Sequence, residues 1–137
     1  MSAIAKRISD ALKVGDVMPE GHEHAGWIYG GISKTTSKPF YIAPKDSGVM
    51  LWEEAMDFAA RSNASVPSRE ELNQIYEARN EGALKCTFNT AGSHPAGWYW
   101  SSSQDGKYYA WAQRFSDGYQ GTVNLKLLAS SLRCVRR

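Results

Sequence analysis

The sequence predicts one α+β domain, in which two helices near the middle of the chain precede a run of antiparallel strands. Apolar residues recur at helical spacing over about residues 51–62, and a second helical pattern starts at residue 68. After residue 83 the chain is rich in aromatic residues and is interrupted by two tight-turn sequences, which is typical of hairpins. Because helices and strands are segregated, and no repeat or interdomain linker is visible, the predicted class is α+β.

The composition narrows the kinds of protein that this chain can be. With 137 residues, 42% of them hydrophobic, the chain is long enough for one domain whose core needs no metal or disulfide. The net charge of +2 comes from scattered residues, which argues against nucleic acid as a partner. No apolar run approaches the roughly 18 residues of a membrane helix, so we expect no membrane insertion.

Residues 1–13 are predicted to form a short amphipathic helix that precedes the globular domain, residues 14–137. Ile4, Ile8 and Leu12 recur on one face of this helix. The helix either docks on its own domain or pairs with copies of itself in a homo-oligomer. No apolar signal-peptide core follows it, so we expect the protein to be cytoplasmic when synthesised.

A β-hairpin is predicted next. Residues 27–32 and 40–42 are rich in aromatic and β-branched side chains, which favour strands. Gly30 and Gly31 interrupt the first strand, and a polar turn joins it to the second.

Two amphipathic helices are predicted to follow the hairpin. The first covers about residues 51–62, and its apolar face consists of Trp52, Ala55, Met56, Ala59 and Ala60. The second begins with a capping box, in which Ser68 caps the backbone and Glu71 reaches back to it. Its apolar face consists of Leu72, Ile75 and Tyr76. Gly82 is predicted to end it.

The second half of the chain is predicted to be an antiparallel meander. Its strands cover residues 98–103, 107–115, 119–125 and 131–136. Residues 104–106 form one tight turn and residues 116–118 another, since an Asp-Gly pair suits the positive φ values of hairpin turns.

Six motifs, taken in order, resemble those of a known family. They are Trp52-Glu53-Glu54-Ala55, Val66-Pro67-Ser68-Arg69-Glu70-Glu71-Leu72, Gly97-Trp98-Tyr99-Trp100-Ser101-Ser102-Ser103, Ala110-Trp111, Phe115-Ser116-Asp117-Gly118 and Leu132-Arg133-Cys134-Val135-Arg136. Over about residues 14–136 the chain resembles C-type-lectin-like domains of bacteria and phages. The function of this family is largely unassigned, and its best-known members form the C-terminal domain of collagen-like adhesins. Residues 14–19 and 30–33 resemble members that phages or prophages encode.

The resemblance implies two helices flanking twisted antiparallel sheets, with the first and last strands paired. It also implies that the second half of the domain binds a carbohydrate or protein ligand, which is a class of function and not a ligand. Many relatives carry a cysteine in the first domain helix, which is missing here, so Cys134 lacks that partner. The Glu-Pro-Asn and Trp-Asn-Asp patterns of calcium-dependent sugar-binding lectins are missing too, so we expect no calcium.

The cysteine and histidine residues offer few reactive groups. We expect Cys86 and Cys134 to be free, buried thiols in a reducing compartment, the alternative being a disulfide formed after release from a cell. His22 and His24 alternate along an extended segment, with His94 as a third candidate metal ligand, but a lone His-x-His in a polar loop is usually solvated. We therefore predict no metal and no other cofactor.

The sequence lacks the patterns of common active sites. It has no Ser-His-Asp or Cys-His signature, phosphate loop or dinucleotide fingerprint. Formylglycine-generating enzymes share the lectin-like fold and use a close cysteine pair, but Cys86 and Cys134 are far apart in the sequence and lie in no such motif. The prediction is that the protein is not an enzyme.

The aromatic residues of the meander are the candidates for ligand binding. Trp100, Trp111 and Phe115 match the family pattern and are assigned to the core. Because neighbours along a strand face opposite sides, other aromatic residues are left for a surface that stacks on sugars or anchors a protein. The predicted ligand-binding residues are Tyr99, Tyr108, Tyr119 and Gln120, with Arg114 and Asn124 as polar contacts. The alternative is that all of these residues are core or scattered surface.

Three functional hypotheses therefore stand. The first is a ligand-binding domain, encoded by or displayed on a phage or prophage particle, that recognises a surface glycan or protein. The second is an assembly module that acts through oligomer contacts of the amphipathic N-terminus. The third, less favoured, is an enzyme of the formylglycine-generating type, which requires Cys86 and Cys134 to lie close together.

Overall fold

The computed structural model describes residues 12–122 and 126–137. Asn124 and nearly all of the predicted helix over residues 1–13 lie outside the described residues. The elements are β1 (Ile28–Ile32), β2 (Pro39–Ile42), β3 (Gly48–Met50), α2 (Trp52–Arg61), α3 (Arg69–Glu77), the 3₁₀ turn η1 (Gly82–Leu84), β4 (Trp98–Asp105), β5 (Tyr109–Arg114), β6 (Gln120–Gly121), β7 (Ser130–Leu132) and β8 (Val135–Arg136). This order of segregated helices and strands confirms the α+β class.

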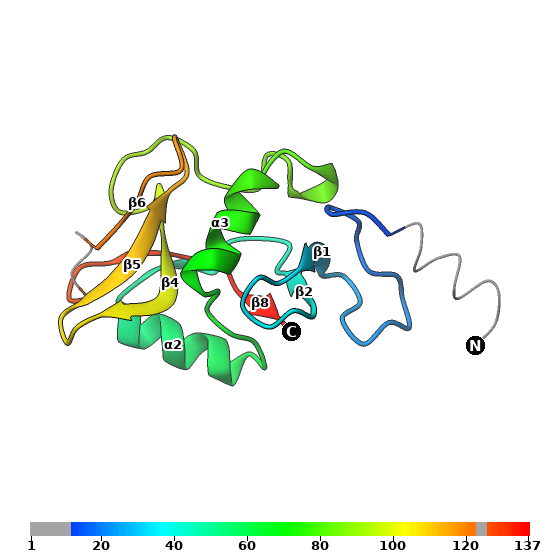
Figure 1. Cartoon of the computed structure of the whole chain (residues 1–137), viewed down its shortest axis with the longest axis horizontal. Helices are drawn as coiled ribbons and strands as arrows, with labels where there is room; N and C mark the ends of the chain where they lie inside the picture. Colours follow the sequence, from blue (N-terminus) through cyan, green and yellow to red (C-terminus); the bar gives the residue numbers. More distant parts are fainter. Residues whose placement is uncertain (1–11, 123–125) are drawn as a thin grey trace.

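The strands form two sheets that lie on opposite sides of α3 (Figure 1). The smaller sheet has the order β1-β2-β8, and the larger has the order β3-β7-β4-β5-β6. The pair β4–β7 is parallel, and the other pairs are antiparallel. The prediction of a purely antiparallel meander was therefore wrong at one place, because β7 returns to the far edge of β4 instead of continuing beyond β6.

The predicted hairpin is confirmed, including its glycine break. The register of β1 against β2 shifts between Tyr29 and Gly31. A Cβ atom at Gly30 would lie only 2.8 Å from the ring of Phe40, so the backbone can approach that ring only at a glycine. The last strand pairs with β2, not with the first strand as the resemblance implied. The outer edge of β1 is instead used by an isolated bridge between Ile28 and Val17.

Both predicted helices are present. In α3 the capping box is complete, since Ser68 Oγ accepts from Glu71 N–H at 3.1 Å and Ser68 N–H donates to Glu71 Oε1 at 3.0 Å. This helix ends at Glu77, so the prediction that Gly82 ends it was wrong. Gly82 serves a close backbone approach, because its added Cβ would lie 2.6 Å from the carbonyl oxygen of Gly15.

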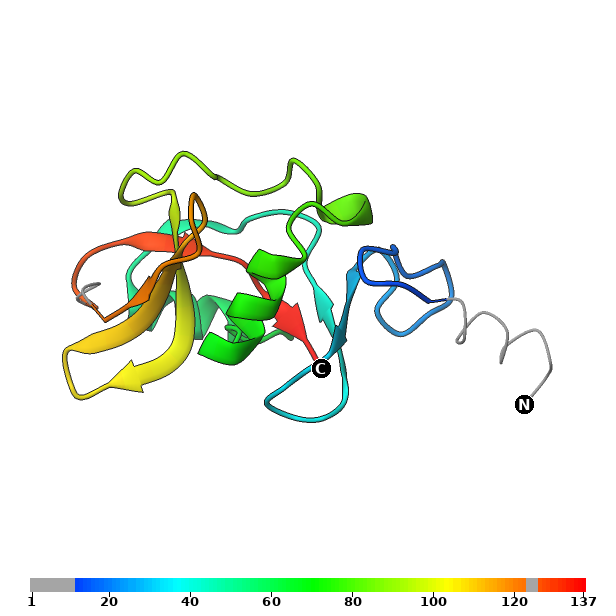
Figure 2. The same ribbon diagram turned by 45° about the horizontal axis from the view of Figure 1, so that its top comes forward.

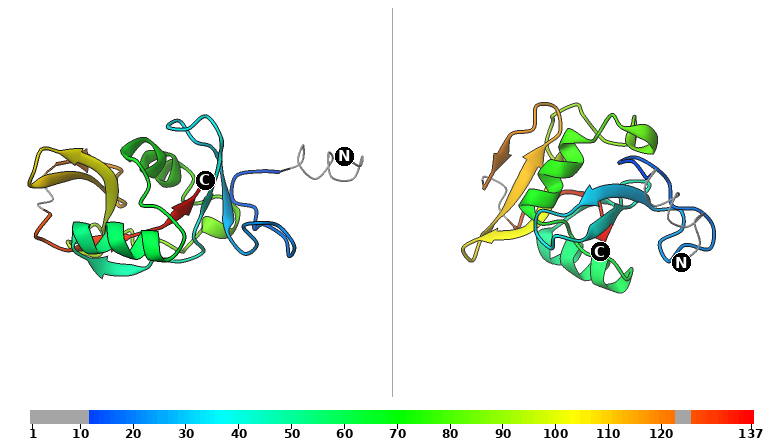
Figure 3. Two further views of the ribbon diagram at one scale, coloured as in Figure 1. Left: turned by 90° about the horizontal axis from the view of Figure 1, so that it is seen from below. Right: turned by 45° about the vertical axis from the view of Figure 1, so that its right-hand side comes forward.

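The helices cover opposite faces of the larger sheet, which fixes where its side chains point. On the α2 side, Trp98 and Trp100 pack with Trp52 and Ala55. On the α3 side, a second cluster joins both sheets through Ile28, Phe40, Leu72, Ile75, Tyr99, Phe115 and Val135. Figure 2 shows α3 lying between the sheets, and the left panel of Figure 3 shows the β1–β2 hairpin and strands β4 and β5 on opposite sides of the helices.

Candidate ligand-binding site

Tyr99 is not a surface residue, and its assignment to the ligand-binding set was wrong. It is fully buried, and its ring packs against Phe115 with ring centroids 4.4 Å apart. Its hydroxyl donates to Asp46 Oδ2 at 2.6 Å and accepts from Asn89 N–H at 2.8 Å. Burial, and then the bond to Asp46, raise the pKa of this hydroxyl well above its ordinary value. Side chains alternate along β4, so Trp98 and Trp100 face α2 and Tyr99 faces α3. Because a helix covers each face, neither set of side chains points to open solvent.

Arg133 lies at the centre of the same buried network. Its side chain is completely buried and donates to the Ala43 carbonyl at 2.8 Å, to Asp46 Oδ1 at 2.9 Å and to the carbonyl and hydroxyl of Thr87 at 2.9 and 3.0 Å. Its guanidinium also lies 4.2 Å from the centroid of the Phe88 ring. Burial lowers the pKa of Arg133, whereas Asp46 raises it. We call Arg133, Asp46, Tyr99 and Thr87 the buried network, because its centre, Arg133 and Tyr99, is fully buried. It joins four segments of the chain and uses every guanidinium nitrogen of Arg133.

A partly exposed group of polar and aromatic residues lies where β4 begins and β5 ends. Trp98 pairs in register with Arg114, whose guanidinium carbon lies 5.4 Å from the Trp98 ring and 5.5 Å from the Tyr119 ring. The rings of Trp98 and Tyr119 meet edge to face, with centroids 6.0 Å apart. Asp117 accepts from Arg114 Nε at 3.0 Å and from Nη2 at 2.6 Å. We call these four residues the arginine–aromatic cluster.

The turn between β5 and β6 holds this cluster in place. Gly118 N–H donates to the Arg114 carbonyl at 2.8 Å, and Arg114 N–H donates to the Tyr119 carbonyl at 2.9 Å. Gly118 has a φ of +83°, which favours glycine, and a Cβ there would lie 2.5 Å from the Tyr76 ring. The predicted Asp-Gly turn is thus present, and it places Asp117 next to Arg114 on the same short loop.

The electrostatics of the cluster leave one guanidinium nitrogen for a ligand. The bidentate bond to Arg114 lowers the pKa of Asp117 to about 2, so the pair stays ionised at any ordinary pH. Among the described residues, Arg114 Nη1 makes no hydrogen bond. The Tyr119 residue is 52% exposed. The cluster therefore offers an aromatic face beside a fixed hydrogen-bond donor.

The remaining predicted site residues do not join the cluster. Tyr108 is 57% exposed but precedes β5, whereas Arg114 ends that strand. Gln120 donates to the Arg69 carbonyl at 2.8 Å and to Gln113 Oε1 at 3.3 Å, which places it on the α3 side. Asn124 lies outside the described residues. The single aromatic surface predicted from the sequence is thus reduced to Tyr119 and Arg114.

Two residues of the cluster were not predicted, and one core assignment was incomplete. Trp98 packs edge to face with Tyr119 although it is only 7% exposed, and Asp117 was predicted only as a turn former. Trp98 lies opposite Arg114 in the β4–β5 hairpin. Aligning the two predicted strands across their turn would therefore have identified Trp98 as a neighbour of Arg114. Trp111, which was assigned to the core, is half-buried. The guanidinium carbon of Arg69 lies 3.7 Å from the centroid of its ring, so a charged side chain and not the apolar core covers it.

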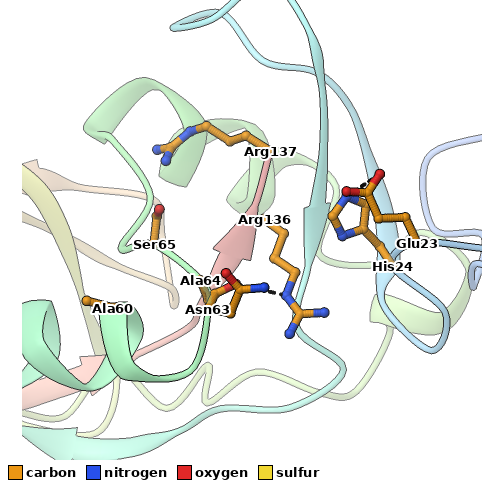
Figure 4. Close-up of a pocket in the computed structure, with 8 residues that line it drawn as sticks. All are labelled: Glu23, His24, Ala60, Asn63, Ala64, Ser65, Arg136 and Arg137. Carbon is orange, nitrogen blue, oxygen red and sulfur yellow. Dashed lines mark hydrogen bonds and ion pairs between the residues drawn. The ribbon is translucent and has the colours of Figure 1, made fainter.

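The histidine segment borders a polar pocket of 320 Å³ beside β8 (Figure 4). His22 Nδ1 accepts the backbone N–H of His24 at 2.9 Å, and the His24 ring packs on Tyr41 with centroids 4.4 Å apart. Burial is the main cause that lowers the pKa of His24. Within the described residues, no three His, Cys, Asp or Glu side chains gather closely enough to hold a metal ion.

The two cysteine thiols are free, but they lie in different surroundings. Cys134 is buried and bonds to Ser47 Oγ at 3.6 Å. Cys86 is exposed, so the prediction that both thiols are buried was wrong for it. It follows η1 with a φ of +64° and lines a small cavity together with Phe88. The thiols line different cavities, an arrangement that offers no support for a paired-cysteine active site.

Comparison with known proteins does not assign the chain to a family. No protein-family model matches the sequence, and no curated protein is similar to it. In the part of the chain that the structure describes, no helix has both the length and the apolar character needed to cross a membrane. The assignment of a function therefore depends on the residues and their geometry.

Proposed function

We propose that the protein is a non-enzymatic, C-type-lectin-like domain that binds a surface glycan through the arginine–aromatic cluster. The observation that carries the proposal is the exposed ring of Tyr119 beside Arg114, whose guanidinium is fixed by Asp117 and keeps one nitrogen free. The cluster lies in the second half of the chain, where the resemblance to bacterial and phage lectin-like domains implies ligand binding. Display on a phage or prophage particle is part of this proposal.

The chemistry of the cluster suits a sugar better than a protein. The apolar face of a sugar ring stacks on an aromatic ring, and its hydroxyl groups accept hydrogen bonds from a guanidinium. A stable protein interface buries about 800 Å² on each partner and centres on several large anchors. The cluster presents one well-exposed ring, which is too little for such an interface but sufficient for a single sugar unit. Many copies on one particle would raise the weak affinity of each by avidity.

A glycan array tests this proposal. The wild-type chain is expected to bind a restricted set of glycans, and Tyr119→Ala is expected to lose them, because the stacking surface is removed. Tyr108→Ala is the matched control, since Tyr108 is equally exposed at the opposite end of β5. The proposal is contradicted if the wild type binds no glycan, or if the two variants bind alike.

A further inference from the structure

A second cavity has mostly apolar walls and shares no lining residue with the arginine–aromatic cluster. It has a volume of 440 Å³, and its apolar lining includes Trp27, Ala43, Pro44, Phe58 and Cys134. This volume falls within the range of small-molecule sites, about 300–1,000 Å³, which are lined mainly by apolar side chains with a few polar groups. Phe58 is 36% exposed and Trp27 is half-buried, so both rings present apolar surface to an entering group.

The charge left unpaired at this cavity is positive. Asp46 lines it, but its two oxygens are already bonded to Arg133 and Tyr99. Lys45 also lines it and makes no hydrogen bond or ion pair with the described residues. The cavity therefore has one neutralised acid and one unpaired base at its rim, which favours a ligand with a negative charge.

Arg136 adds a second positive charge at the boundary of the cavity. Its guanidinium carbon lies 4.2 Å from the Trp27 ring centroid, and its nitrogens donate to the carbonyls of Ser62 at 3.5 Å and Asn63 at 3.1 Å. No carboxylate among the described residues pairs with it. Its neighbour Arg137, by contrast, is neutralised by a bidentate bond to Glu71, at 3.0 and 2.6 Å. Carbonyl oxygens orient the Arg136 guanidinium without cancelling its charge.

Arg136 lines the polar pocket of Figure 4 and also contacts residues of the apolar cavity. Arg136 lines the polar pocket together with Glu23, Asn63 and Ser65, and it contacts Trp27 and Ser62, which line the apolar cavity. The Glu23 side chain is 85% exposed, and its carboxylate lies 3.9 Å from His24 Nε2 and forms no ion pair with Arg136. We infer that this pair of cavities is a binding site for a small amphipathic anion, whose apolar body occupies the apolar cavity and whose acidic group binds Arg136. This site is separate from the arginine–aromatic cluster and does not depend on the proposed glycan binding.

The fluorescent probe 8-anilinonaphthalene-1-sulfonate has the required chemistry, an apolar aromatic body with one acidic group. We expect the full chain to bind it at one saturable site. Arg136→Gln is expected to weaken binding by about tenfold or more, since a charged hydrogen bond is lost. Arg61→Gln is the matched control, because Arg61 on α2 is exposed and its one ion pair within residues 12–122 and 126–137 is with Asp57. Circular dichroism shows whether both variants fold.

The reactivity of the Cys134 thiol gives a second measure of probe binding. It is measured in a chain that keeps Arg136, so it does not depend on whether Arg136→Gln folds. In a Cys86→Ser chain, Cys134 is the one thiol left, and it lines the apolar cavity. A bound probe is expected to slow its reaction with a methanethiosulfonate reagent in proportion to occupancy. The inference is overturned if the probe binds and Cys134 reacts at an unchanged rate, which marks adventitious surface binding only. It is equally overturned if Arg136→Gln and Arg61→Gln bind the probe alike, or if the wild type does not bind it.

Discussion

Arg133 and Arg114 are the same residue type, and each is paired with an aspartate and lies near an aromatic ring, but they differ in burial and in how many of their donors are used. Arg133 has a completely buried side chain with bonds to two carbonyls, a hydroxyl and Asp46. Arg114 has a side chain 35% exposed, one bidentate bond to Asp117 and a free nitrogen. The comparison shows that an arginine whose donors are all used holds segments together, whereas one with a donor left over beside an exposed ring is available to a ligand.

The largest expected loss of stability comes from a substitution that breaks the buried network. Arg133→Met should lower the free energy of unfolding by about 3–5 kcal/mol, since the loss of the fully buried guanidinium leaves the half-buried Asp46 and the oxygens of Ala43 and Thr87 without their donor. Urea unfolding followed by tryptophan fluorescence measures it. Arg114→Met is the control, and its midpoint should stay at the wild-type value because exposed pairs contribute little. If Arg133→Met and Arg114→Met lowered the urea midpoint equally, the claim that only Arg133 stabilises the fold would be contradicted.

The next largest effect tests a third arginine pair. Glu71 is fully buried and accepts hydrogen bonds from Arg137, Ser33 and Ser68. Burial raises its pKa, but those hydrogen bonds outweigh burial and leave the pKa below its ordinary value of 4.5. The charged form is therefore the stabilising one, so this stability is complete above about pH 4.5 and is lost as the pH falls through the folded pKa. Glu71→Gln should cost about 1.5–3 kcal/mol at neutral pH.

Unfolding titrations of the wild type and Glu71→Gln, from neutral to acidic pH, measure this difference. The gap between the two free energies of unfolding should narrow as the pH falls, because the wild-type carboxylate becomes protonated. A gap that stays constant with pH would mean that the charge of Glu71 does not contribute, and that only the shape of the side chain does.

The smallest expected effect on stability concerns the exposed pair. Asp117→Asn should leave the urea midpoint unchanged but weaken glycan binding, because Arg114 loses the bidentate bond that orients it. Since the pKa of Asp117 is about 2, glycan binding by the wild type should not change as the pH is lowered to about 3. Surface plasmon resonance at several pH values checks both statements, and a binding curve that titrates between pH 4 and 6 would contradict them.

Local patterns in the sequence were sufficient for the helices and turns. The capping box of Ser68 and Glu71, the glycine break in β1 and the turn at Asp117 each depend on a few neighbouring residues, and all three are confirmed. The strand β3 was missed because it has three residues, none of them buried, and exists through its pairing with β7. Its formation depends on a chain segment some eighty residues away, which no local pattern reveals.

The site was harder to predict than the fold. Tyr99 and Trp98 are neighbours on β4, and alternation cannot say which one reaches a surface when α2 and α3 cover both faces. The bond between Arg133 and Asp46 spans 87 positions and depends on how loops fold over the sheets. Tyr119 and Arg114 were selected for their residue types, and the turn at Asp117 brings them together in the structure.

The most direct test asks whether Arg114 serves binding and not stability. It measures two properties of Arg114→Met: the affinity for the glycan that binds best on the array, by calorimetric titration, and the urea midpoint of unfolding. The prediction is an affinity about tenfold lower or more, since a charged hydrogen bond is lost, with a midpoint equal to that of the wild type. An unchanged affinity, or an affinity that falls only together with the midpoint, would contradict the claim that the exposed cluster binds the ligand.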